Sequence, residues 1–103
     1  MKLKLTQNDA QEFIYKLGIL ADEPDLQEDY SLTKAQADEL VALIPLNGGD
    51  VTVPAWAVDA VRGEMEDHCE VLCGCASDAR GEGLNGQALT ISKHARRIEK
   101  IIQ

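Results

Sequence analysis

One apolar pattern constrains the fold of this chain more than any other feature of its sequence. Between residues 58 and 79 it repeats at intervals of three, four, three, four, three and four residues, at Val58, Val61, Met65, His68, Leu72, Cys75 and Ala79. This spacing keeps the side chains on one face of an α-helix, as in a coiled-coil seam. Pro54 suits a first helical turn, where its missing N–H needs no partner. The pattern therefore predicts a long packed helix over about residues 54–80.

Shorter helices are indicated where a Thr or Ser precedes apolar residues spaced three and four apart. Thr6 with Asp9, and Thr33 with Gln36, have the spacing of a capping box, in which two side chains satisfy the free amides of a helix start. Ser92 precedes a last apolar series, which predicts a helix over residues 92–103. We expect this helix to fold back antiparallel on the long one and form a C-terminal helical hairpin.

Three short fragments alternate apolar and polar residues as a half-buried strand does. They are Leu3/Leu5, Val51/Val53 and Leu89/Ile91. The glycine-rich segment 81–86 is predicted to be a mobile loop. Two interpretations remain open. One is an α+β domain with a minor sheet of two or three strands, and the other is an all-helical domain with extended linkers. In both, the fold class is mainly α.

The length of 103 residues is typical of one domain, so we expect residues 1–103 to form a single small domain. Only four residues are aromatic, which makes the core aliphatic and leaves two possibilities open, a monomer or a homodimer that completes the core. The formal charge is −8. Nucleic-acid binding through a general basic surface is therefore not expected.

The first residues contain two lysines but no apolar stretch behind them, which does not match a signal peptide. The apolar runs are far shorter than a membrane span. We therefore expect a cytoplasmic protein with no membrane partner. Three cysteines within seven residues do not resemble a secreted disulfide framework, so reduced thiols are expected.

Charge is distributed unevenly along the chain. Five acids and no base lie between Asp22 and Asp29, whereas the last helix is rich in bases: Lys93, Arg96, Arg97 and Lys100. One interpretation is an internal match, in which these bases face the acids of the long helix, Glu64, Glu66, Asp67 and Glu70. The other is that the asymmetry reflects a binding partner.

The only cluster with chemistry-bearing residue types is His68, Cys69, Cys73 and Cys75. Thiolates and imidazole bind zinc, but the spacing lacks the paired CxxC pattern of a zinc site. Buried cysteine commonly packs as a small hydrophobe. A Cys–His nucleophile would also need an activating geometry and a cleft. We therefore expect core packing here, with no metal, no cofactor and no enzymatic activity.

The acidic segment is the candidate partner-binding surface. Pro24 is expected to keep it an exposed loop, and its carboxylates have no neighbouring base in the sequence. Tyr30 adds an aromatic residue of the kind enriched at interface anchors. The candidate binding residues are Asp22, Glu23, Asp25, Glu28, Asp29 and Tyr30.

The opening Met1-Lys2-Leu3-Lys4-Leu5-Thr6, followed by an acidic helix in about a hundred residues, resembles the small acidic accessory proteins of phages and prophages. That group includes anti-CRISPR and other anti-defence inhibitors. The resemblance implies a non-enzymatic inhibitor or adaptor that binds a host protein. The alternative is a small regulator that contacts nucleic acid through its basic C-terminal helix.

Overall fold

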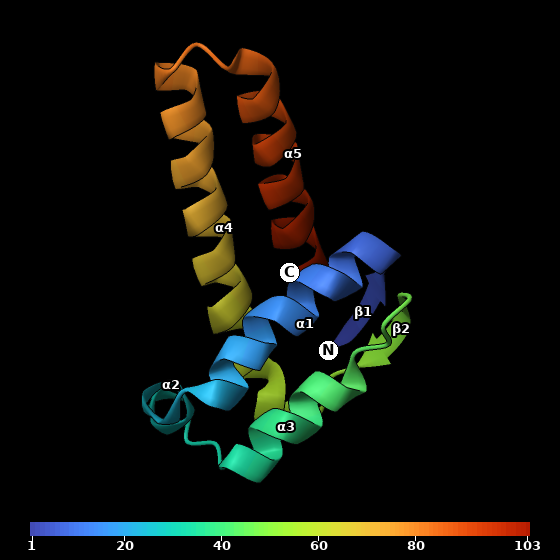
Figure 1. Cartoon of the computed structure of the whole chain (residues 1–103). Helices are drawn as coiled ribbons and strands as arrows, with labels where there is room; N and C mark the ends of the chain where they lie inside the picture. Colours follow the sequence, from blue (N-terminus) through green and yellow to red (C-terminus); the bar gives the residue numbers. More distant parts are fainter. The chain divides into compact units, whose positions relative to one another are not determined.

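The computed structural model describes all residues from Met1 to Gln103. It is mainly α-helical with one small sheet (Figure 1), which confirms the predicted fold class. The elements are β1 (Lys2–Leu5), α1 (Gln7–Asp22), α2 (Pro24–Asp29), α3 (Lys34–Leu43), β2 (Gly49–Thr52), a 3₁₀ turn (Ala55–Ala57), α4 (Val58–Gly81) and α5 (Asn85–Ile102). The chain divides into two compact units, Met1–Glu64 and Met65–Gln103.

The sheet of the first unit has two antiparallel strands. Leu3 of β1 lies opposite Val51 of β2, and both side chains are buried. Lys2 and Lys4 alternate with the buried leucines and are exposed, as the period of two requires. Two of the three predicted strands are thus present. The prediction of a third strand at Leu89 and Ile91 was wrong, because residues 89–91 belong to the helix α5.

Two helices of the first unit, α1 and α3, begin at the predicted caps. The Thr6 amide donates to the Asp9 carboxylate over 2.8 Å and the Asp9 amide to the Thr6 hydroxyl over 3.2 Å. Thr33 and Gln36 make the same reciprocal pair at the start of α3. Figure 1 shows α1 and α3 side by side. Their packed faces supply the largest fully buried side chains of this unit, including Phe13, Leu17, Leu20 and Leu40.

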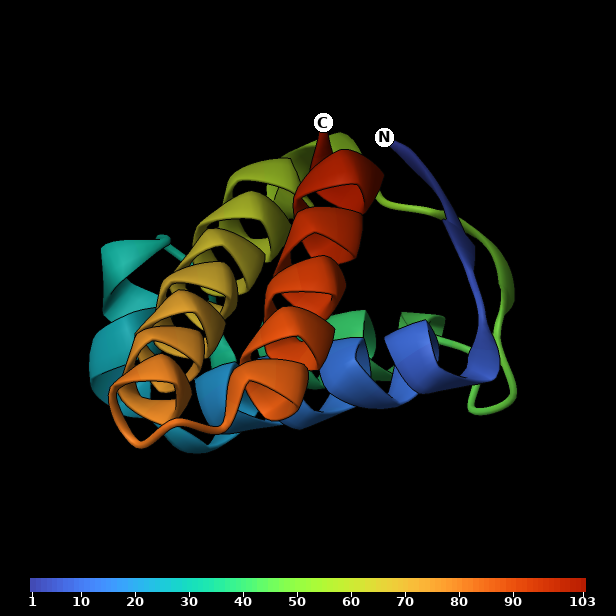
Figure 2. The same cartoon turned by 90° about the horizontal axis from the view of Figure 1, so that it is seen from above.

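The second unit contains the predicted helical hairpin, in which the part of α4 from Met65 onward and α5 lie side by side (Figures 1 and 2). Near the connection its core is small: Ala76, Ala79 and Ala88 are buried together, with Ile91 packed against them. The Arg80 guanidinium donates to the Ser92 hydroxyl over 3.1 Å. These small side chains bury little apolar surface.

The connection between the two helices is shorter and more regular than the mobile loop predicted over residues 81–86. The Leu84 amide donates to the Ala79 carbonyl and the Gly83 amide to the Arg80 carbonyl, at 2.8 and 3.0 Å. With Gly83 at φ 81°, this is a Schellman motif, which satisfies the last carbonyls of α4. The chain then enters α5 at Asn85, seven residues before the predicted start at Ser92.

The apolar seam of α4 is confirmed in part, and its positions Val58 and Leu72 are only half-buried. Val61, Met65, His68 and Ala79 are buried, but Cys75 is exposed and Ala76 is buried instead. A straight α-helix has 3.6 residues per turn, so a strict seven-residue repeat drifts by about 20° per heptad. By the third heptad that drift has moved the buried face from position 75 to position 76.

Candidate functional site

The six candidate residues span the end of α1 and all of α2, and we call this surface the acidic edge. The five carboxylates, at Asp22, Glu23, Asp25, Glu28 and Asp29, are all exposed, whereas Tyr30 is half-buried. The expectation of a loop here was wrong. Asp22 ends α1, and residues 24–29 form the separate helix α2.

Pro24 starts α2 instead of breaking the structure. It occupies the first turn, where its fixed φ favours the helix and its absent N–H would have no partner in any case. The residues before it close α1, since the Glu23 amide donates to the Ile19 carbonyl over 3.1 Å. The proline therefore separates two helices without leaving an irregular segment between them.

Gln27 fastens α2 to α1. Its side-chain amide donates to the carbonyl oxygens of Leu20 and Ala21, at 3.1 and 2.9 Å. These carbonyls belong to the last turn of α1, where helical partners are missing. The side chain is 8% exposed, so both hydrogen bonds are shielded from water. Gln27 was not among the candidate residues. Its one signal in the sequence is an amide within an otherwise acidic run.

A second Schellman motif ends α2. The Leu32 amide donates to the Gln27 carbonyl over 2.8 Å, and the Ser31 amide to the Glu28 carbonyl over 3.0 Å. Ser31 adopts φ 55°, in the left-handed region that favours glycine. Leu32 is buried. Together with Gln27, this turn fixes both ends of the acidic edge on the first unit.

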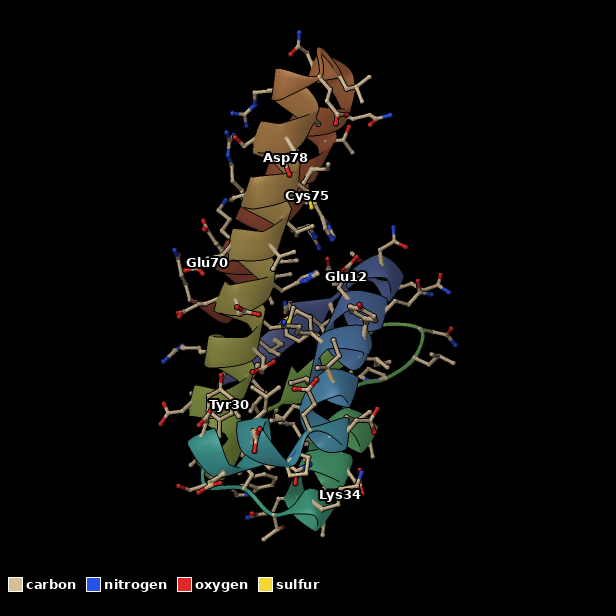
Figure 3. All side chains as sticks on the ribbon, turned by 60° about the vertical axis from the view of Figure 1, so that its left-hand side comes forward. Glu12, Tyr30, Lys34, Glu70, Cys75 and Asp78 are labelled. Carbon is tan, nitrogen blue, oxygen red and sulfur yellow. The ribbon has the colours of Figure 1, made fainter.

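Tyr30 uses its ring within the fold. The ring lies against Gly63 in the first turns of α4, where any Cβ would collide with the phenol. Figure 3 shows Tyr30 at the α2 end of the first unit. The carboxylates of the acidic edge are exposed, whereas the tyrosine ring packs against α4.

The carboxylates of the acidic edge have no ion-pair partner. One exposed ion pair of this unit, Lys34 with Asp38 at 2.8 Å, lies on α3. Residues 1–64 carry 12 acidic and five basic residues, a formal charge of −7 out of the total −8. Like charges on an exposed surface repel one another modestly in water, so this arrangement lowers stability slightly and leaves the carboxylates available to a cationic surface.

The thiols of the second unit have different environments. Cys69 is buried and its Sγ donates to the Ala95 carbonyl over 3.5 Å, while Cys73 and Cys75 are exposed. Burial raises the pKa of the Cys69 thiol to about 11, and the nearby charge of Glu99 adds to the rise. His68 is buried. No group of three or more His, Cys, Asp or Glu residues is arranged to hold a metal ion.

A hollow of about 480 Å³ lies beside these thiols. It is lined by Glu66, Cys69, Glu70, Cys73, Glu99, Ile102 and Gln103. Figure 3 shows Glu70 projecting from α4. The carboxylates oppose ionisation of the Cys69 thiol, because a thiolate beside them would add a like charge. The hollow therefore lacks the electropositive setting that a reactive cysteine needs.

The bases of α5 form a second charged surface, which we call the basic face. Lys93, Arg96, Arg97 and Lys100 are all exposed and line one shallow hollow together with Glu99 and Gln103. Pairing with the acids of α4 was one interpretation of these bases. Lys93, Arg96 and Lys100 make no ion pair with those acids, so for these three residues that interpretation was wrong.

Comparison with known proteins identifies no relative. No protein-family model matches the chain, and neither a curated protein nor a solved structure is similar to it. None of the helices combines the length and apolar character that crossing a membrane requires.

Proposed function

We propose that this chain is a non-enzymatic accessory protein that binds a host protein through the acidic edge and acts as an inhibitor or adaptor. A phage or other mobile-element origin, including a role against host defence, rests on the sequence resemblance described above. The observation that carries the binding proposal is that five exposed carboxylates without ion-pair partners stand on a helix fixed to α1 by Gln27.

The spacing of the carboxylates suits a cationic partner surface. Asp25 and Asp29 are four residues apart on α2, and Glu28 is three residues from Asp25. Such positions are neighbours on a helix surface, about 5–6 Å apart. Because α2 is already ordered, a partner need not pay to order a loop on binding. Complementary charge of this kind mainly accelerates association and selects the partner.

A non-enzymatic role is supported by the state of the thiols. The buried thiol has a raised pKa and accordingly stays protonated near neutral pH, and the carboxylates around the hollow oppose its activation. A binding protein requires no such nucleophile. Its specificity comes from the shape and charge of its surface.

The test compares two variants of equal charge. Asp25→Asn, Glu28→Gln and Asp29→Asn are combined in one chain. Glu39→Gln, Asp78→Asn and Glu82→Gln, which are exposed and lie outside the acidic edge, are combined in the control. Both are used to capture proteins from host lysate beside the unmodified chain, with quantitative mass spectrometry. We expect one basic host protein to be retained by the unmodified chain and the control, and lost with the acidic-edge variant.

The affinity of each variant for the purified partner then decides whether the acidic edge is the binding surface. We expect the acidic-edge variant to bind at least about tenfold more weakly than the control at low salt, with a smaller loss of affinity as salt is added. Circular dichroism checks that both variants keep their helices. If the two variants bind every captured protein equally, the acidic edge is not the binding surface.

A further inference from the structure

The basic face of α5 concentrates the scarcer kind of charge in this molecule. The chain has 18 acidic and 10 basic residues, and four of those 10 lie within eight residues of α5. Positions 93, 96, 97 and 100 are spaced three, four and seven residues from the first, so a helix places them along one stripe. Their shared hollow shows the same grouping in space.

The fold leaves this positive charge largely unneutralised. Lys93, Arg96 and Lys100 make no ion pair, although acids outnumber bases and Glu66 and Glu70 lie on the neighbouring helix of the same unit. Exposed ion pairs add at most about 1 kcal/mol each, so folding alone does not require one. Lys93, Arg96 and Lys100 are therefore available to an anionic partner.

The residues that line the basic face do not resemble the centre of a protein interface. They are Lys93, Arg96, Arg97, Glu99, Lys100 and Gln103, with no aromatic or aliphatic side chain among them. Protein interfaces derive most of their affinity from buried apolar and aromatic anchors. Contacts to nucleic-acid phosphates need no such anchor, because release of counterions supplies the free energy.

The shape of α5 selects among nucleic acids. An α-helix with its side chains is about 10–12 Å across, which the major groove of B-form DNA admits at about 12 Å. The major groove of A-form RNA is too narrow. Single strands are usually held by bases stacking on aromatic rings, and the basic face has none. The exposed guanidinium group of Arg96 suits bidentate contacts to phosphate oxygens.

We propose that the basic face of α5 binds the phosphate backbone of duplex DNA, without sequence preference. The basic face and the acidic edge consist of different residues, so DNA binding by the basic face does not depend on protein binding by the acidic edge. Acidic residues elsewhere in the chain repel DNA, so the attraction comes from the basic face.

The charge count fixes the expected salt dependence. Three bases without an ion pair, Lys93, Arg96 and Lys100, neutralise about three phosphates, which gives a slope of log affinity against log salt of about −3. The unmodified protein should bind a 20-base-pair duplex in fluorescence anisotropy at low salt and release it as salt rises. Neutralising both Lys93 and Lys100 with Gln should make the slope shallower by about two.

Matched variants separate a local surface from total charge. Lys2→Gln with Lys4→Gln removes two exposed lysines from β1 and changes net charge by the same amount. We expect this control to keep the slope of the unmodified chain. Glu99→Gln should do the opposite of the α5 lysine variant, binding more tightly with a slope steeper by up to about one. Its control is Glu39→Gln, which should leave binding unchanged.

Several results would overturn the proposal. One is no duplex binding at low salt, and another is an equal loss of affinity in the α5 and β1 lysine variants. Tighter binding of a single strand of the same length would exclude the duplex. Competition by poly-glutamate at an equal concentration of charge would assign the surface to an acidic protein. A different result would support the proposal. If the acidic-edge variant keeps its DNA binding and loses its protein partner, the two surfaces act independently.

Discussion

Cys69 and Cys73 lie one helical turn apart on α4 and differ in almost every physical respect. The Cys69 thiol is 3% exposed and donates to a backbone carbonyl of α5, so its neutral form is a structural part of the hairpin. Cys73 is exposed and lines the same hollow. A shared position on a helix face therefore does not give two cysteines a shared function.

The raised pKa of the Cys69 thiol predicts that the folded chain loses stability at alkaline pH. Its pKa rises on folding from 9.0 to about 11, so between those values the folded chain retains a proton that the unfolded chain has lost. Stability therefore falls as pH rises through this window, by about 2 kcal/mol from this residue. Denaturant unfolding at pH 8 and pH 11 measures the change. Cys69→Ala should lose less stability over the same interval, and an identical loss would contradict the assignment.

At the scale of elements, α2 and α4 end in the same Schellman motif with different residues at its left-handed position. That position holds Gly83 after α4, at φ 81°, and Ser31 after α2, at φ 55°. A side chain disfavours this conformation because its Cβ approaches the backbone. The acidic edge therefore rests on a turn that carries a small backbone strain.

Exchanging the residue types tests this pair of turns. Ser31→Gly should stabilise the first unit by about 0.5–1 kcal/mol, and Gly83→Ser should destabilise the hairpin by a similar amount. Nothing lies within 4 Å of a Cβ built at Gly83, so the second cost comes from the backbone alone. Chemical denaturation of each variant gives the values. Destabilisation by Ser31→Gly would mean that the serine side chain supports the turn.

The helices and strands also show which structural features local sequence patterns can predict. The caps at Thr6 and Thr33 were predictable because a capping box involves only four consecutive residues. The helix α2 was not predictable, since a proline such as Pro24 is equally typical of a helix break and of a first helical turn. What decides between them is Gln27, whose hydrogen bonds reach six and seven residues back. Likewise, the alternation at Leu89 and Ile91 resembled a strand, but Ala88 and Ile91 pack against alanines of α4.

The candidate site was predictable in part for the same reason. Charge runs are visible in a sequence, so both the acidic edge and the bases of α5 were found from it. Whether those charges are matched within the fold depends on side-chain geometry between helices, and pairing with Glu66 and Glu70 was the wrong expectation for Lys93, Arg96 and Lys100. Tyr30 packs against Gly63, which lies 33 positions further along the chain, and no local sequence pattern predicts such a contact.

At the scale of the whole molecule, the two compact units differ in how they are held together. The first buries large side chains such as Phe13, Leu17 and Leu40, whereas the hairpin near its connection buries alanines. A region with little buried apolar surface opens locally at a lower free-energy cost. The hairpin end is therefore expected to be the less stable part of the chain.

Native-state hydrogen exchange tests this difference. Helical amides in residues 76–91 should exchange at least about tenfold faster than those of α1 around residues 13–20. Gly74→Ala provides a control in α4, because nothing lies within 4 Å of the added Cβ and alanine favours the helix by about 1 kcal/mol. That variant should slow exchange in α4 and leave α1 unchanged. Equal protection in the two segments would contradict the expectation.

The buried amide of Gln27 has a consequence for how this protein can change over generations. It ties α2 to α1 through two backbone carbonyls, while the carboxylates beside it are exposed and make no ion pair. Selection can therefore replace those carboxylates one at a time with little loss of stability. The charges of the acidic edge can therefore change to fit a new binding partner, provided that Gln27 and the turn at Ser31 are kept.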